Sequence, residues 1–190
     1  MRKRTQSGFS MIELMTVVVI ILILSAIALP NFLIGLRNNQ LNAASSELSM
    51  LIQRARYEAV RRNDTVAVRE VVGSDPQQVY VDVNNDIAPQ VTEPTIVLRA
   101  NFQLNVAGAP GFGSMSYTGA APAPLPNIAA FDGRGGMDFT TQGLNILPKV
   151  LIITVGDASR PQDGFRAVAT TPQGRSVVWR VTPGATYWSH

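Results

Sequence analysis

The chain has 190 residues, 46% hydrophobic and 15% charged, which is enough for one modest domain and an apolar anchor. It has no cysteine and a single histidine, His190, which excludes disulfides, thiolate nucleophiles, histidine-based catalytic triads and Cys- or His-type metal sites. The net charge of +3 equals that of Arg2, Lys3 and Arg4; the other 13 basic residues are balanced by 13 acidic ones, so general attraction to nucleic acid is not expected.

An apolar segment follows this basic start. No side chain in residues 14–36 is charged, and the segment is long enough to cross a bilayer as a helix. By the positive-inside rule, Arg2, Lys3 and Arg4 predict a cytoplasmic N-terminus. The alternative is an ordinary secretory signal peptide, but the segment is longer than its apolar region, and the nearest small-residue site, Ser25-Ala-Ile-Ala28, lies inside it.

Glu13 lies at the cytoplasmic edge of the apolar segment, where the presence of a carboxylate needs a physical explanation. An unpaired carboxylate there costs on the order of 2–3 kcal/mol, so we expect it to have a partner. Cleavage after Gly8 would free the α-amino group of Phe9, four residues before Glu13. In a filament, Glu13 of one subunit would pair with that amine on its neighbour and set the axial register.

The segment that begins Gly8-Phe9-Ser-Met-Ile-Glu13 and continues as an apolar helix resembles the class III signal of type IV pilins and type II secretion pseudopilins. The resemblance implies cleavage between Gly8 and Phe9 by the prepilin peptidase, N-methylation of Phe9 and a structural role for Glu13. Pro30 matches the helix kink of that family. The resemblance also implies a single-pass protein of the bacterial inner membrane with a periplasmic head.

One long helix is predicted from about Phe9 to Arg62, bent or locally melted near Pro30 and Gly35. Its second half has apolar residues at helical spacing, which predicts burial of one face: Leu41, Ala44, Leu48, Leu51, Ile52, Ala55 and Ala59. Asn63 and Asp64 are the expected stop. We therefore expect a leader at 1–8, a membrane and packing helix at 9–36, an amphipathic continuation at 37–62 and a β-rich head at 63–190.

The apolar period changes to two after residue 64, which indicates strands. They are predicted at 65–72, 79–83, 95–100, 103–106, 150–155, 165–170 and 176–181. Residues 107–127 are rich in Gly, Ala and Pro, which predicts a surface loop. Residues 171–174 are predicted to form a tight hairpin turn. The predicted fold class is α+β, with an antiparallel sheet packed on the C-terminal half of the helix.

Three features of the head resemble the GspH/FimT branch of pseudopilins and minor pilins. They are the aspartate-rich turn Val81-Asp-Val-Asn-Asn-Asp86, the segment Phe131-Asp-Gly-Arg-Gly135 and a closing hairpin containing Gly174-Arg175. The glycines around Arg134 read as a turn that exposes this arginine, since the segment is too short and lacks the lysine of a phosphate-binding loop. Arg134 would then be free to contact a neighbouring subunit.

Asp82, Asn84 and Asp86 have the 1-3-5 spacing of a calcium loop, and Glu93 falls at its twelfth place. Ile87 occupies the position that requires glycine in such a loop, which favours a polar β-turn. The sequence predicts no metal or cofactor, and calcium binding at this turn stays open.

The predicted function is assembly: a minor pilin or pseudopilin that enters a type II secretion pseudopilus or the tip of a type IV pilus. Its expected partners are the prepilin peptidase, other pilin-like subunits and the inner-membrane assembly platform. The alternative is a DNA-uptake subunit, because some FimT-like minor pilins bind DNA through a C-terminal Gly-Arg-x-Arg motif. Arg175 and Arg180 are the candidate contacts, but Val177 stands where that motif has its second arginine. An enzyme is not indicated.

Overall fold

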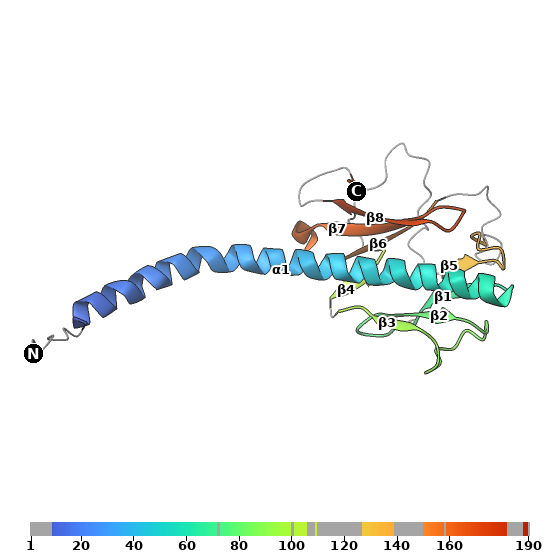
Figure 1. The fold of residues 1–190 in the computed structure, drawn as a ribbon, viewed down its shortest axis with the longest axis horizontal. Coiled ribbons are helices and arrows are strands. Elements are labelled where there is room, and N and C mark those ends of the chain that lie inside the picture. Colours follow the sequence, from blue (N-terminus) through green and yellow to red (C-terminus); the bar gives the residue numbers. More distant parts are fainter. Residues whose placement is uncertain are drawn as a thin grey trace, which may run out of the picture. The chain divides into compact units, whose positions relative to one another are not determined.

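The structure is a computed structural model that describes residues 9–71, 73–99, 101–105, 109, 127–138, 150–157, 159–181 and 188–189. The chain divides into two compact units, Met1–Asn38 and Asn39–His190. Helix α1 (Met11–Arg62) begins in the first unit and ends in the second (Figure 1).

The first unit contributes the start of α1. The helix begins at Met11, two residues after the predicted start, where the backbone N–H groups of Glu13 and Leu14 both donate to the Ser10 carbonyl (3.0 and 3.2 Å). The helix continues without interruption through Pro30 and so is not locally melted there. A kink at Pro30 stays a prediction.

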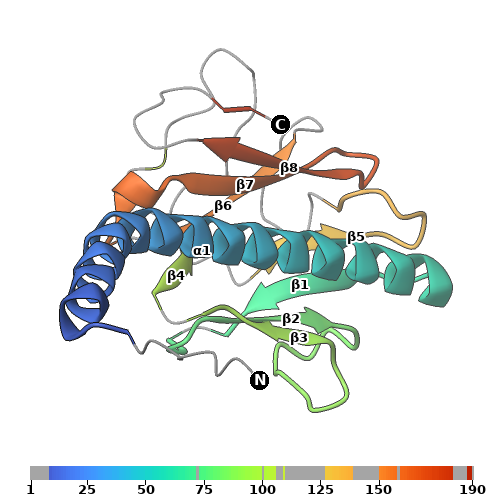
Figure 2. The same cartoon turned by 60° about the vertical axis from the view of Figure 1, so that its left-hand side comes forward.

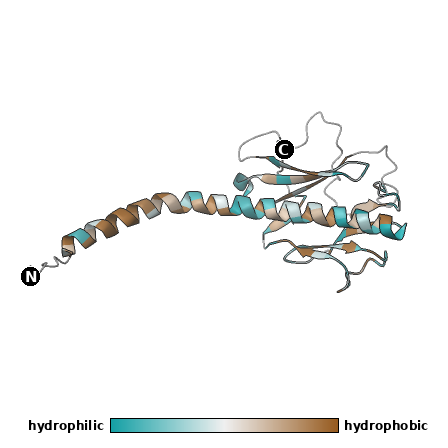
Figure 3. Cartoon of the chain, viewed as in Figure 1, coloured by the Kyte–Doolittle hydropathy of each residue, from teal (hydrophilic) through white to brown (hydrophobic). Residues whose placement is uncertain are grey.

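The helix of the first unit is apolar on all sides, and most of it is brown in Figure 3. Every residue from 9 to 36 is exposed except Ser25, which is half-buried. By length and composition this helix is able to span a membrane. An apolar surface of this extent requires a cover of lipid or other protein.

In the second unit, α1 buries one face. The predicted stripe is confirmed, because all of its members are buried: Leu41, Ala44, Leu48, Leu51, Ile52, Ala55 and Ala59. The helix ends where Asn63 takes a left-handed conformation (φ 53°). The N–H groups of Asn63 and Asp64 then bond to the carbonyls of Val60 (3.3 Å) and Ala59 (3.2 Å), which is a Schellman cap and confirms the predicted stop.

Within its described residues, the second unit has eight strands in two four-stranded sheets, where the sequence predicts a single sheet. The strands are β1 (Val66–Glu70), β2 (Gln78–Asp82), β3 (Thr95–Val97), β4 (Phe102–Leu104), β5 (Asn127–Phe131), β6 (Leu151–Asp157), β7 (Phe165–Thr170) and β8 (Ser176–Val181). Their order is β3-β2-β1-β5 in one sheet and β4-β6-β7-β8 in the other. All pairings are antiparallel, so the predicted α+β class is confirmed.

The two sheets lie on either side of the C-terminal half of α1 (Figures 1 and 2). One apolar cluster joins the helix stripe to both sheets, with Val68 and Phe131 from the first and Ile153 and Val168 from the second. The helix is therefore the common partner of two sheets, each of which buries one face against it.

β5 was not predicted, because Ala129 and Ala130 are poor strand formers and the segment adjoins the Gly- and Pro-rich stretch. Both alanines are fully buried and lie opposite β1, where small side chains permit close packing. The short 3-10 helix Pro161–Asp163 was not predicted either. Most of the predicted 107–127 loop lies outside the described residues.

Candidate functional site

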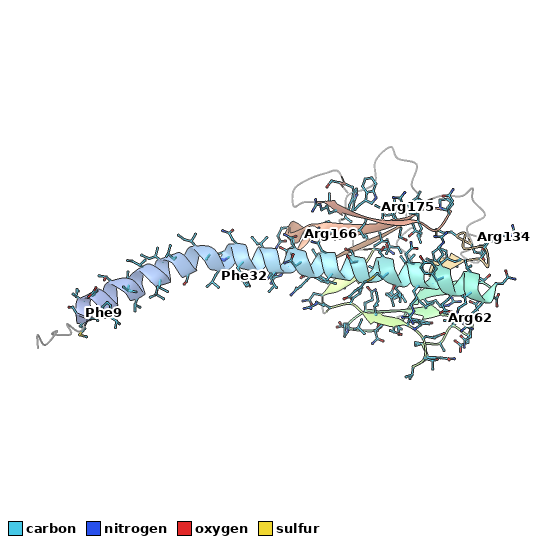
Figure 4. The ribbon with its side chains drawn as sticks, viewed as in Figure 1. Phe9, Phe32, Arg62, Arg134, Arg166 and Arg175 are labelled. Carbon is cyan, nitrogen blue, oxygen red and sulfur yellow. The ribbon has the colours of Figure 1, made fainter. Side chains whose placement is uncertain are left out.

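The N-terminal candidates lie at the start of the exposed helix. Phe9 precedes α1 and is 83% exposed, and Figure 4 shows it at the end of the ribbon. Glu13 is exposed and falls in the first turn, where a carboxylate interacts favourably with the helix dipole. Gly8 lies outside the described residues. The arrangement leaves the Glu13 carboxylate accessible to a second molecule.

The aspartate-rich turn gathers three carboxylates. Asp82, Asp86 and Glu93 each offer an oxygen within 4.8 Å of the others. Asn84 contacts this set, because its side-chain amide donates to the Asp86 carboxylate (2.9 Å). The predicted 1-3-5 spacing therefore places its first and last members beside Glu93, and the middle member is hydrogen-bonded to the last.

These carboxylates are engaged within the turn. Asp82 is fully buried and forms an ion pair with Arg69, which is 6% exposed. Glu93 accepts hydrogen bonds from the N–H groups of Val83 (3.0 Å) and Gln90 (3.1 Å).

Asp86 is held in the same way, because the backbone N–H of Ala88 donates to its carboxylate (3.0 Å) and lowers its pKa. One buried oxygen of Asp82, Oδ1, accepts no hydrogen bond within the described part of the chain. Carboxylate oxygens suit a hard cation, but the Arg69 guanidinium already neutralises the most buried member. The bonding is that of a polar turn, and we assign the cluster a structural role.

The two glycine-containing motifs form one structure around Arg56. The Arg56 guanidinium donates to the Gly135 carbonyl (2.9 Å), and the neighbouring Gln53 of α1 donates to the Gly174 carbonyl (3.0 Å). The N–H of Met137 bonds to the Pro172 carbonyl (2.9 Å) and so joins the two turns directly. Sequence reasoning missed Arg56, since nothing in its spacing distinguishes it from the other exposed-face arginines of the helix.

Steric contacts explain why glycine is needed in these turns. Gly174 has φ 80°, and a Cβ there would lie 2.7 Å from the Arg56 side chain and 2.8 Å from the Gly135 carbonyl oxygen. Asp132 fixes the other turn by accepting from the N–H groups of Arg134 (3.0 Å) and Gly136 (2.8 Å). The Arg134 side chain is exposed, as predicted.

Arg175 and Arg180, the candidate DNA contacts, do not converge. They are five positions apart, and only Arg180 belongs to β8 (Ser176–Val181). Arg175 is exposed in the hairpin that precedes β8. Arg180 instead lies directly opposite Arg166 of β7. Figure 4 shows Arg166 and Arg175 toward different ends of this sheet.

Comparisons with known proteins bear on both units. The N-terminal segment matches a family model described as the prokaryotic N-terminal methylation motif, over residues 3–29. The structure of the type IV minor pilin FimU from Pseudomonas aeruginosa is similar, with a TM-score of 0.52 and 17% identity over 80% of this chain and 98% of that chain. A second crystal form of FimU from the same organism has a TM-score of 0.50 and 14% identity, over 77% of this chain and 100% of that chain.

The minor pseudopilin EpsH from the Type 2 Secretion System of Vibrio cholerae has a TM-score of 0.45 and 12% identity, over 77% of this chain and 99% of that chain. No curated protein sequence matches the chain. The FimU structures, at these identities, show the fold. The chain therefore combines an N-terminal methylation motif with a type IV pilin-like fold.

Proposed function

We propose that this chain, with its pilin-like fold, is a structural subunit of a helical filament and is made as a membrane-anchored precursor. The observation that carries the proposal is the continuity of the methylation motif with an exposed apolar helix. Lipid would cover this helix before assembly, and the helices of other subunits would cover it afterwards. Without such a cover, the helix would expose its apolar side chains to water.

Maturation would follow from the first residues. The prepilin peptidase would remove residues 1–8 by cutting between Gly8 and Phe9, and Phe9 would be N-methylated. Glu13 of one subunit would pair with the Phe9 amine of its neighbour. Residues 9–36 would pack in the filament core, 37–62 would connect them to the head, and the head formed by 63–190 would contact other subunits.

Two filaments would suit such a subunit: a type II secretion pseudopilus and the tip region of a type IV pilus. In either, the precursor would sit in the inner membrane with its N-terminus cytoplasmic and its head periplasmic. Arg2, Lys3 and Arg4 support this orientation. An inner-membrane assembly platform would then extract the processed subunit into the filament.

The DNA-uptake alternative has less support. Arg175 lies in the hairpin before β8 and Arg180 near the end of the strand, and beyond residue 4 the chain has equal numbers of basic and acidic residues. A duplex requires several basic groups that follow its phosphates on one surface. The head therefore has no charge excess to offer a nucleic acid.

The test is the intact mass of the protein recovered from its native membrane, with fragmentation of its N-terminus. A chain that begins at Phe9 with one added methyl group is the expected result. A chain that still begins at Met1 in cells with an active prepilin peptidase, or one cut near Ala28, would overturn the proposal.

A further inference from the structure

A pocket in the second unit lies between α1 and the sheet that contains β7 and β8. Its volume is about 240 Å³, several times the roughly 30 Å³ that one water occupies in the liquid. It is lined by Asn42, Ser45 and Ser46 from α1 and by Arg166, Val178 and Arg180 from the sheet. None of these six described residues carries a carboxylate.

Two arginines define the charge of this pocket. Arg166 and Arg180 are directly opposite one another on antiparallel strands, a pairing that is unfavourable for like charges. Arg166 is 6% exposed, and its guanidinium donates to Asn42 Oδ1 (2.7 Å) and to the Phe165 carbonyl (3.0 Å). Burial and, secondly, the charge of Arg180 lower the pKa of Arg166. An anion between the two arginines would offset the repulsion between their charges.

The residues that line the pocket favour a single carboxylate over a nucleic acid. A carboxylate is planar and accepts two parallel hydrogen bonds from a guanidinium fork. Val178 offers an apolar wall for the methylene stem of an acidic side chain. Duplex phosphates instead need a row of exposed cations, whereas Arg166 is recessed.

We propose that this pocket receives the carboxylate of an Asp or Glu side chain from a neighbouring pilin-like subunit, an inference that rests on the filament function proposed above. Asn42 lies only six positions after Leu36, the end of the apolar segment that would pack in the filament. In the sequence, this lining residue therefore follows closely after the segment that would bring subunits together. Its charge would select which acidic subunit docks beside this one.

The first step of the test places a photo-crosslinking amino acid at Ser46 in the full-length chain, in cells that assemble the filament. The expected adduct joins Ser46 to a segment of another pilin-like subunit that contains an Asp or Glu. The control position is Val91, which is fully exposed and lies outside the pocket. An adduct with nucleic acid, or adducts no more frequent than those at Val91, would overturn the proposal.

The second step is a charge exchange. Arg180→Glu is expected to lower incorporation into filaments by about tenfold or more, because a lost partner in a desolvated charge pair weakens an interface at least that much. Changing the crosslinked acid of the partner to Arg should restore incorporation. The matched control is Arg99→Glu, the same change at an exposed position of the head outside the pocket.

The outcomes separate the two proposals. Arg180 is itself exposed, and thermal unfolding of Arg180→Glu should match that of Arg99→Glu, so that lost folding is not mistaken for lost docking. Equal incorporation of Arg180→Glu and Arg99→Glu, in filaments whose subunits begin at methylated Phe9, would sink the pocket inference and leave the filament function standing. An unprocessed N-terminus would instead defeat the filament function itself.

Discussion

Asp82 shows how this head stabilises a charge away from water. Its carboxylate is fully buried, forms an ion pair with Arg69 and accepts the backbone N–H of Ile87 (3.2 Å). Arg69 also donates to Asn85 Oδ1 (2.9 Å), so it links β1 to the aspartate-rich turn. A buried pair of this kind makes a modest net contribution, but loss of one partner leaves an uncompensated charge.

Asp82→Asn is therefore expected to destabilise the head by about 3 kcal/mol, because the Arg69 guanidinium would stay buried without its counter-charge. The measurement is urea unfolding of the full chain in detergent, followed by the combined fluorescence of Trp179 and Trp188. Asp75→Asn is the control, since it makes the same chemical change at an exposed position. Equal midpoints for the two variants would contradict the structural role of the pair.

Tyr80 provides a prediction for pH. It is 2% exposed, and burial, followed by the charge of Asp82, raises its pKa above the ordinary value of 10.0. The folded state thus favours the neutral phenol. The resulting stability is present below the pKa of the unfolded chain and is lost as pH rises through the higher pKa of the folded state.

Between about pH 9 and pH 11, the wild-type unfolding midpoint should therefore fall more steeply than that of Tyr80→Phe, which has no phenol to ionise. The same urea titration, repeated across this range, makes the comparison. Parallel slopes for the two proteins would mean that burial does not shift the ionisation of Tyr80.

At the scale of elements, the two glycine turns can contact α1 closely because their glycines have no Cβ atom. Gly174→Ala would strain a residue at φ 80° and would place a Cβ against Arg56 and the Gly135 carbonyl. Gly73 is a matched control, because its φ is 78° but no atom lies within 4 Å of the added Cβ. The pair separates backbone strain from steric displacement.

Gly73→Ala should cost roughly 1 kcal/mol, the strain of a left-handed alanine. Gly174→Ala should cost about 2 kcal/mol or more, since the clash adds to the same strain. Thermal unfolding of the two variants provides the comparison. If Gly174→Ala were no worse than Gly73→Ala, the two turns would not depend on close contact with the helix.

Local patterns made α1 and most strands predictable. The helical spacing of the apolar residues predicts the buried stripe of α1 directly, and Asn63 marks the end of the helix. β5 escaped prediction because the burial of Ala129 and Ala130 is decided by the strand beside them. The division into two sheets, and the pairing of Arg166 with Arg180, depend on strand order and register, which a single sequence does not contain.

The same contrast applies to the candidate sites. Phe9 and Glu13 were predicted from sequence because the methylation motif is contiguous, and the family model that spans residues 3–29 matches there. Arg56 and the pocket around Arg166 were missed, because each joins α1 to segments more than 70 positions away. Sequence reasoning thus found the local motif, and only the fold revealed the contacts between distant segments.

The whole molecule joins an uncovered apolar helix to a head with its own core. The helix from residue 11 to 36 is almost entirely exposed, while the stripe that follows it is buried by the two sheets. This division explains why one continuous helix changes from apolar on all sides to one-sided. The first part would find its partners in other molecules, and the second finds them within this chain.

Glu13→Gln tests this division at the level of assembly. The variant should still be cut after Gly8 and methylated on Phe9. Its incorporation into filaments should fall by about tenfold or more, because the amine of Phe9 would lose a charge partner worth on the order of 2–3 kcal/mol. Glu47→Gln, the same change at an exposed position of α1 in the second unit, is the control. The measurement is the ratio of filament to membrane protein, with N-terminal mass as the check on processing. Normal incorporation of Glu13→Gln would show that subunit register is set elsewhere, and failure of cleavage would assign Glu13 to recognition by the peptidase.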